Sequence, residues 1–126
     1  MRLLLDTVTF LWAASSPAHL SREAMSALRN ESAVREISAI SLSEIAIKSA
    51  RGKLTFGQDD LYAAVTALQL RVLPYTAEHA FRLFDLPLHH GDPFDRQIIA
   101  QALAEGIPVV TADETFRLYR GLKVIW

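Results

Sequence analysis

The 126-residue sequence predicts one α/β domain, a three-layer α/β/α sandwich around a central parallel sheet of about five strands. Its length suits a single domain over residues 1–126, and no repeat or linker-like segment divides it. Short apolar runs alternate with longer segments in which alanine and leucine recur at helical spacing. Because parallel strands need crossover connections, this alternation predicts helices on both faces of the sheet.

Each predicted element rests on a local pattern. The strands are short apolar runs, expected at Arg2–Leu5, Glu36–Ala39, Arg71–Pro74, Pro108–Val110 and Lys123–Ile125. The helices lie between them, at Val8–Ala14, Ser21–Arg29, Ser41–Ala50, Asp59–Leu70, Ala77–Phe84, Pro93–Glu105 and Glu114–Tyr119. Gly106 suits the left-handed position after a helix, and Pro108 follows it closely.

Composition limits the kind of protein. The chain has no cysteine, which excludes disulfides and thiolate metal ligands and favours a reducing, cytoplasmic setting. Its first residues, MRLLLDTVTFLWAASS, look like a secretion signal, but Asp6 interrupts the apolar run, and no run is long enough to span a membrane. The net charge of −1 argues against a general polyanion binder, unless several acids share a cation-filled pocket and leave a basic exterior.

Four acidic residues occupy informative places. Asp6 directly follows the first predicted strand, and Asp113 follows the strand that ends in VVTA. Glu44 lies in the first turn of the helix expected after the second strand, and Asp95 lies in the first turn of the helix that begins at Pro93. Ligands of open parallel sheets bind beyond the carboxyl ends of the strands, so three of these acids are expected at one edge. Asp95 can join them from its helix.

Helix capping is the simplest alternative for each acid taken alone. Ser41–Glu44, SLSE, matches a capping box, and in DPFD Asp92 suits the cap position. Asp95 is favourable in a first helical turn, and Asp6 or Asp113 can cap the helix that follows it. Capping does not explain why most predicted strand ends carry an acid, because serine, threonine and asparagine cap as well.

If gathered together, these carboxylates would repel one another strongly. Two unit charges about 5 Å apart repel by roughly 3 kcal/mol at an effective dielectric constant near 20, and four mutually close acids would approach about 20 kcal/mol. A domain with a net stability of about 5–15 kcal/mol does not tolerate that cost. Protons or divalent cations must offset it, and oxygen ligands suit Mg²⁺ or Mn²⁺. Mg²⁺ often completes its shell with phosphate, which favours a phosphodiester substrate hydrolysed by an activated water.

The whole chain resembles one family through four stretches in order: LLLDTVTFLWA, ISAISLSEIAIKSARGKL, LPLHHGDPFDRQIIAQALAEGIPVVTADETF and the terminal VIW. These stretches are similar to those of the PIN-domain ribonucleases and, within them, the VapC toxins of bacterial toxin–antitoxin pairs. The resemblance implies an α/β/α fold and a Mg²⁺- or Mn²⁺-dependent endoribonuclease that acts on RNA. It also implies a homodimer and a cognate antitoxin that covers the acidic site.

By resemblance, the family's catalytic and metal-binding acids fall on Asp6, Glu44, Asp95 and Asp113. Asp92, the first acid of DPFDR, is better explained as a helix cap. Thr7 and Thr111 match small hydroxyl positions beside the acids, where they either orient carboxylates and waters or cap helices. Many relatives carry an aromatic residue before the helix glutamate, and this chain has Ser43, which bears on the site wall and substrate preference.

Basic residues near the acids have supporting roles in this interpretation. Arg96, next to Asp95, is expected to bind phosphate or steady the acids, since a planar guanidinium can do both. Lys48 and Arg51 lie at the end of the helix that carries Glu44. There they interact favourably with the helix dipole, and they are weaker candidates for contact with RNA.

His89 and His90 precede the DPFDR turn. Paired histidines can bind metal or move protons, so a metal-free ribonuclease with a histidine base at the ribose 2′-OH is a rival mechanism. The metal mechanism is favoured because no matching basic site accompanies the histidines. They are instead expected to shape the loop, with His90 as a weak candidate for RNA contact at the rim.

Two interpretations lie outside the nuclease class. A phosphoacceptor receiver domain also gathers acids at a sheet edge, but it needs two adjacent acids after the first strand, and Asp6 stands alone. A non-catalytic RNA-binding or protein-interaction module with the same fold needs no full set of acids. Substitution of Asp6 or Asp95 by asparagine separates the classes, because only an enzyme would lose RNA cleavage while staying folded.

Overall fold

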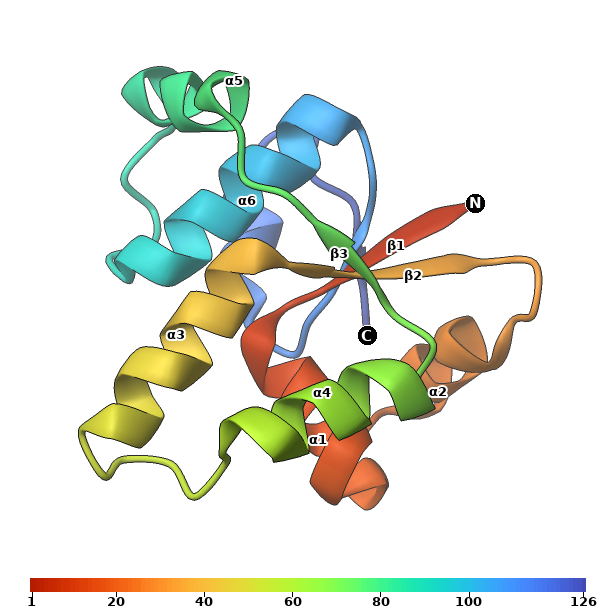
Figure 1. The fold of residues 1–126 in the computed structure, drawn as a ribbon. Coiled ribbons are helices and arrows are strands. Elements are labelled where there is room, and N and C mark those ends of the chain that lie inside the picture. Colours follow the sequence, from red (N-terminus) through yellow and green to blue (C-terminus); the bar gives the residue numbers. More distant parts are fainter.

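Parallel strand pairs build the central sheet of the computed structural model, which describes residues 1–126. The strands are β1 (Arg2–Leu5), β2 (Val34–Ser38), β3 (Arg71–Leu73), β4 (Val109–Val110) and β5 (Val124–Ile125). Their order is β3-β2-β1-β4-β5, so β1 occupies the centre (Figure 1). Leu5 of β1 pairs with Ile37 on one side and with Val110 on the other. The predicted parallel sheet of five strands is confirmed.

Helices cover both faces of this sheet. They are α1 (Thr7–Ser15), α2 (Arg22–Arg29), α3 (Ala39–Ala50), α4 (Gln58–Ala67), α5 (Ala77–Phe81) and α6 (Pro93–Glu105), with short 3₁₀ helices η1 (Pro17–His19), η2 (Arg82–Asp85) and η3 (Glu114–Leu118). Helices α1, α2 and α4 lie on one side of the sheet, and α5 and α6 lie on the other (Figure 1). Helix α3 packs toward both sides, through Ile40 and Ile45. The predicted three-layer α/β/α sandwich is therefore confirmed.

The three leucines of β1 are all fully buried. Leu4 packs into the core cluster that contains Ile98 of α6, whereas Leu3 packs with Ala24 of α2 and Leu5 packs with Phe10 of α1. Successive side chains of a strand point to opposite faces, so a strand covered on both sides needs an unbroken apolar run. Burial of each such side chain contributes about 1.5–3 kcal/mol.

Helix α3 begins two residues earlier than the sequence indicates. Ser38 is its N-cap, and the Ser38 hydroxyl accepts a hydrogen bond of 2.9 Å from the Ile40 amide. The expected strand through Ala39 therefore ends one residue sooner, and the expected capping box Ser41–Glu44 is wrong. Ser41 is instead fully buried inside the helix.

Other helix ends also differ from the expected ones. The chain leaves α4 through Gln69, whose φ of 53° is left-handed, so this helix is shorter than the predicted segment 59–70. The predicted segment 77–84 is divided into α5 and η2, and the segment 114–119 forms only the 3₁₀ helix η3. None of the helices is both long enough and apolar enough to cross a membrane.

One buried acid in the sheet has a structural role. Glu36 of β2 is fully buried, and its carboxylate accepts hydrogen bonds from Arg2 at 2.6 Å and from Arg71 at 3.0 Å. Burial alone would raise the pKa of Glu36, but the two guanidinium groups outweigh it and hold the pKa below its ordinary value. These contacts tie the three neighbouring strands β1, β2 and β3 together.

Candidate acidic site

The four acids identified in the sequence lie beyond the carboxyl ends of the strands or on helices beside them. Asp6 follows β1 directly, and Asp113 lies beyond the end of the neighbouring strand β4. Glu44 lies in the middle of α3, and Asp95 lies in the first turn of α6. Helices α3 and α6 run side by side in Figure 1, so the two helical acids come from adjacent elements.

Asp6 caps a helix and faces the site with different oxygens. Its Oδ1 accepts a hydrogen bond of 2.9 Å from the Thr9 amide, which caps α1. Its Oδ2 accepts a hydrogen bond of 2.6 Å from the Thr111 hydroxyl, beyond β4. Burial raises the pKa of Asp6 despite these bonds, and the nearby charge of Asp113 raises it further.

Glu44 is buried between a hydroxyl and an ammonium group. The Thr7 hydroxyl donates to Glu44 Oε1 at 2.6 Å, and Thr7 Oγ1 also lies 2.8 Å from Ser41 Oγ. Lys48, one turn later on α3, donates to Glu44 Oε2 at 2.6 Å. Its hydrogen bond to Glu44 raises the pKa of Lys48, and the charges of Asp92 and Asp95 add to the shift. Lys48 therefore serves as a counter-ion for the acids.

Asp95 and Asp113 face the same imidazole. Nε2 of His90 lies 2.8 Å from Asp113 Oδ2 and 3.2 Å from Asp95 Oδ2. Ligand atoms of these three residues all lie within 4.8 Å of one another. Asp113 Oδ1 meanwhile accepts a hydrogen bond of 2.9 Å from the Thr115 amide and so caps η3.

The pKa values of the two carboxyl groups are shifted in opposite directions. Burial raises the pKa of Asp95 to about 7, helped by the charges of Asp92, Asp6 and Glu44, while His90 opposes the rise. Burial alone would also raise the pKa of Asp113, but hydrogen bonds from Thr115 and His90 outweigh it and lower the pKa. Two of the other three acids, Asp6 and Glu44, therefore contribute to the raised pKa of Asp95.

Capping and a shared acidic site coexist in this fold. Asp92 caps α6 by accepting hydrogen bonds from the amides of Phe94 and Asp95, as the sequence predicts. Asp6 and Asp113 cap helices with Oδ1 only, which leaves Oδ2 of each for other contacts. The two explanations weighed from the sequence are therefore not exclusive.

The basic residues lie differently from what the sequence suggests. Arg96 contacts no acid: it donates to the carbonyl oxygens of Pro87 at 2.8 Å and Leu86 at 3.3 Å, so the expectation that it steadies the acids is corrected. Consecutive helical residues point in directions about 100° apart, which turns Arg96 away from the face of Asp95. Arg51 is exposed at the end of α3.

Sequence reasoning underestimated His90. It placed this residue at the rim, whereas the ring lies between two of the acids. The only sequence signal is its position just before the cap of α6, and the contact with Asp113 spans 23 residues. His89 is exposed and packs edge-on against Tyr119, and Ser43 is exposed on α3.

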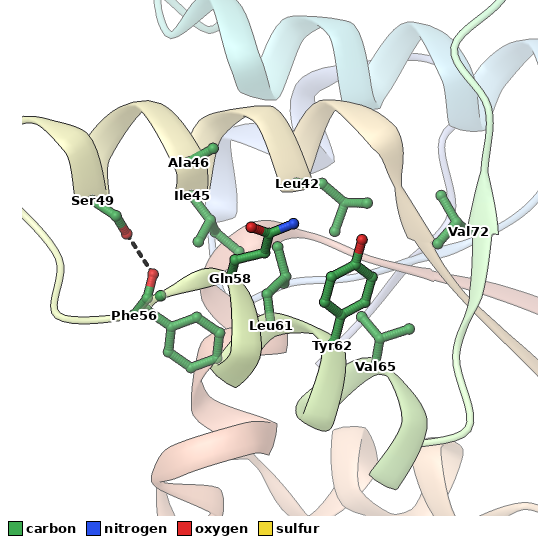
Figure 2. Close-up of a pocket in the computed structure, with 11 residues that line it drawn as sticks. Leu42, Ile45, Ala46, Ser49, Phe56, Gln58, Leu61, Tyr62, Val65 and Val72 are labelled. Atoms are coloured by element: carbon green, nitrogen blue, oxygen red, sulfur yellow. Dashed lines mark hydrogen bonds between the residues drawn. The ribbon is translucent and has the colours of Figure 1, made fainter.

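A separate apolar pocket of about 490 Å³ lies on another face of α3 (Figure 2). Leu42 and Ile45 of α3 line it together with Leu61 and Val65 of α4, and no acidic residue contributes. Glu44 points elsewhere, because helical residues that share a face are spaced three or four apart. The pocket is therefore distinct from the acidic site.

The acidic site has a donor set that fits a hard divalent cation. Its oxygens come from carboxylates, and the chain supplies only one lysine as a direct partner for Glu44. Burial raises the pKa of Asp6 and of Asp95, and the charges of neighbouring acids add to both shifts. Carboxylate oxygens are the ligands that Mg²⁺ and Mn²⁺ prefer.

Fold and site together define a parallel-sheet α/β protein with an acidic site beyond the carboxyl ends of its central strands. Comparison with family models gives the particular family. The PIN domain model matches residues 3–122, and the chain belongs to the PIN domain family. No curated protein matches the chain significantly.

Solved structures share the fold at low sequence identity. VapBC2 from Rickettsia felis, bound to a DNA fragment from its promoter, superposes with a TM-score of 0.72 at 18% identity, covering 98% of this chain and 97% of that one. DNA-bound VapBC from Salmonella typhimurium gives 0.72 at 20% identity, with coverages of 98% and 96%. VapBC-5 from Mycobacterium tuberculosis, a member of a family of toxin–antitoxin systems, gives 0.62 at 17% identity, with coverages of 98% and 97%.

Proposed function

We propose that this chain is a divalent-metal-dependent endoribonuclease that hydrolyses RNA phosphodiester bonds. The observation that carries the proposal is the meeting of Asp95, from α6, and Asp113, from beyond β4, at one imidazole, with ligand atoms of the three residues within 4.8 Å of one another. The charges of Asp6 and Glu44 both raise the pKa of Asp95, and the charge of Asp113 raises the pKa of Asp6. A small domain maintains such a cluster at a cost to its stability, and a cation site is the simplest use for it.

The residues that would hold Mg²⁺ or Mn²⁺ are Asp6, Glu44, Asp95 and Asp113. When bound, the cation supplies an activated water and stabilises charge on the phosphate oxygens of the scissile bond. The protein's own hydroxyl groups orient the acids: Thr111 holds Asp6 Oδ2, and Thr7 holds Glu44 Oε1. Lys48 balances part of the negative charge near Glu44. As a cation beside the site, it is also the candidate for contact with the phosphate backbone of RNA.

A cleavage assay on purified protein tests this function. We expect total RNA to be cut with Mn²⁺, and cleavage to stop in excess EDTA. Asp6→Asn and Asp95→Asn should lose at least about 100-fold in rate while circular dichroism shows an unchanged fold. Cleavage that continues in EDTA and leaves a 2′,3′-cyclic phosphate would instead support the histidine mechanism.

We further propose that the chain is the toxin of a toxin–antitoxin pair, with a cognate antitoxin as its protein partner. The supporting observation is that solved structures with this fold include the VapBC complexes named above. The absence of cysteine supports a cytoplasmic location. Expression of this chain should arrest growth, and co-expression of a small gene found beside its own should relieve the arrest and yield a co-purifying complex.

We propose a homodimer as the assembly. Phe81, Phe84 and Leu88, on α5, η2 and the loop that follows, are 68%, 87% and 85% exposed. Large apolar side chains exposed together are typical of surfaces that contact another protein. Burial against a second copy would remove them from water.

A non-catalytic RNA-binding or protein-interaction module is the second candidate. The apolar pocket between α3 and α4 favours it, because such pockets accept ligands or partner side chains without any chemistry (Figure 2). In that case Asp95→Asn would leave every measured property unchanged apart from stability, since the carboxylates would have no cation to bind.

A further inference from the structure

His90 is held rigidly in the acidic site. Its backbone amide donates to the Tyr119 hydroxyl at 2.8 Å, and its ring meets the Phe116 ring edge-on at a centroid distance of 5.7 Å. Its Nδ1 accepts a hydrogen bond of 3.1 Å from the amide of Asp92, the residue that caps α6. The start of the helix that carries Asp95 thus also fixes the imidazole ring.

The contact with the Asp92 amide determines which ring nitrogen carries hydrogen. The amide N–H can donate only to a nitrogen with a free lone pair, so Nδ1 accepts and the ring hydrogen lies on Nε2. That hydrogen points toward Asp113 Oδ2 at 2.8 Å, with Asp95 Oδ2 at 3.2 Å. His90 therefore donates to Asp113, and the carboxylate of Asp95, from a different segment, lies beside the same nitrogen.

The same contact argues against His90 as a cation ligand. Coordination through Nε2 would use the lone pair of that nitrogen and move the hydrogen to Nδ1. Nδ1–H would then face the Asp92 amide, and two donors would oppose each other at 3.1 Å.

We propose that His90 is a positioning residue: its Nε2–H holds the side chain of Asp113 next to that of Asp95, in place for a divalent cation, and His90 does not bind the cation itself. This inference rests on the proposed function, because it gives the two carboxylates a cation to bind. Each carboxylate oxygen has two lone pairs, so Asp113 Oδ2 can accept from His90 and still coordinate. Asp113 Oδ1 is oriented independently by the Thr115 amide.

Titration with Mn²⁺ alone, followed by calorimetry, tests the role of His90 without any RNA. His90→Ala should weaken Mn²⁺ binding by about 10–100-fold, the usual effect of losing a group that orients a metal ligand. His90→Gln should bind within about threefold of wild type, because its amide can donate to Asp113 and accept from the Asp92 amide. His89→Ala is the matched control, since that exposed ring contacts Tyr119 and no acid, and it should leave affinity unchanged.

Nitrogen-15 NMR of the wild-type imidazole provides a second readout that does not depend on how the variants fold. We expect His90 to be protonated at Nε2, and to stay so when Mg²⁺ is added. A switch of the proton to Nδ1 on Mg²⁺ binding would overturn the proposal in favour of direct ligation. Unchanged or tighter Mn²⁺ binding by His90→Ala, or a loss in His90→Gln equal to that in His90→Ala, would also overturn it. Wild-type protein that binds no Mn²⁺ would overturn this inference and the metal-dependent function together.

Discussion

The Thr111 hydroxyl donates a 2.6 Å hydrogen bond to Asp6 Oδ2, across 105 residues of sequence. Both residues are buried, and they lie just beyond the paired strands β4 and β1. The same Thr111 oxygen accepts a hydrogen bond of 3.0 Å from the Asp113 amide. One hydroxyl therefore links the positions of two of the acids.

Thr111→Val should impair the site more than the fold. Valine has the shape of threonine but no hydroxyl, so Asp6 Oδ2 loses its donor and the Asp113 amide loses its acceptor. We expect a loss of about 1–3 kcal/mol in stability and a 10–100-fold loss in Mn²⁺ affinity, measured by urea unfolding and calorimetry. Thr111→Ser keeps the hydroxyl and should recover most of the affinity. A valine variant with wild-type affinity would contradict the assigned orientation.

Asp95→Asn should stabilise the protein when no metal is present. The pKa of Asp95 rises from an ordinary value of 3.8 to about 7 on folding, so its ionised form opposes folding. That cost is absent below about pH 4 and reaches its full size above about pH 7, where the variant should gain about 1–4 kcal/mol. Thermal unfolding in EDTA at several pH values measures the difference.

Asp59→Asn is the control for that experiment, because Asp59 is exposed in the first turn of α4 and should give no gain. Saturating Mn²⁺ should raise the melting temperature of wild type and leave Asp95→Asn almost unchanged, since ligand binding stabilises only a protein that binds it. A variant that is no more stable than wild type at pH 8 would show that Asp95 carries no electrostatic cost.

The sequence predicts those parts of the fold that depend on local pattern. The leucines of β1 indicate a strand buried on both faces, and Asp92 before Pro93 predicts the start of α6; the structure confirms both. The start of α3 is harder to predict, because Ser38 and Ser41 are equally good caps by type. Burial decides between them: Ser41 lies next to Thr7 inside the protein, which leaves Ser38 to cap.

Some residues of the candidate site can be predicted from local sequence patterns, and others cannot. The acids can be found from the sequence because strand ends and helix starts are local features, and parallel topology then places them near one edge. The position of His90 depends on Tyr119 and Asp113, both more than 20 residues away, so no local pattern reveals it. Arg96 is misjudged because adjacency to Asp95 in sequence does not imply a shared face of a helix.

Phe84→Glu should disrupt the proposed homodimer. Phe84 is 87% exposed, so a charge at this position does not disturb the core, but it would be costly inside an apolar interface. Light scattering should give about twice the chain mass of 14.0 kDa for wild type and the single chain mass for the variant. Tyr62→Glu, at a position of α4 that is 66% exposed, is the control and should remain dimeric. A wild-type protein that is monomeric in solution would contradict the proposed homodimer.

Glu36→Gln should weaken the fold without affecting the acidic site. The carboxylate lies fully buried beneath Arg2 and Arg71, and its pKa is lowered in the folded protein. Its contribution is therefore present above the unfolded pKa of about 4.3 and is lost as the pH falls through the folded value. Because both arginines remain partly in water, we expect a cost of about 1–3 kcal/mol at pH 7.

Urea unfolding of Glu36→Gln at pH 7 and again near pH 3, with EDTA present throughout, distinguishes an ionic from a purely steric role. The stability difference from wild type should shrink at the lower pH, where protonation of Glu36 weakens its ion pairs with Arg2 and Arg71. Glu105→Gln, which removes a more exposed partner of Arg2 and His79, should cost less at pH 7. Mn²⁺ affinity should stay at the wild-type value in both variants, since neither carboxylate lies among the acids of the site. An equal loss of stability at both pH values would mean that shape, rather than charge, accounts for the role of Glu36.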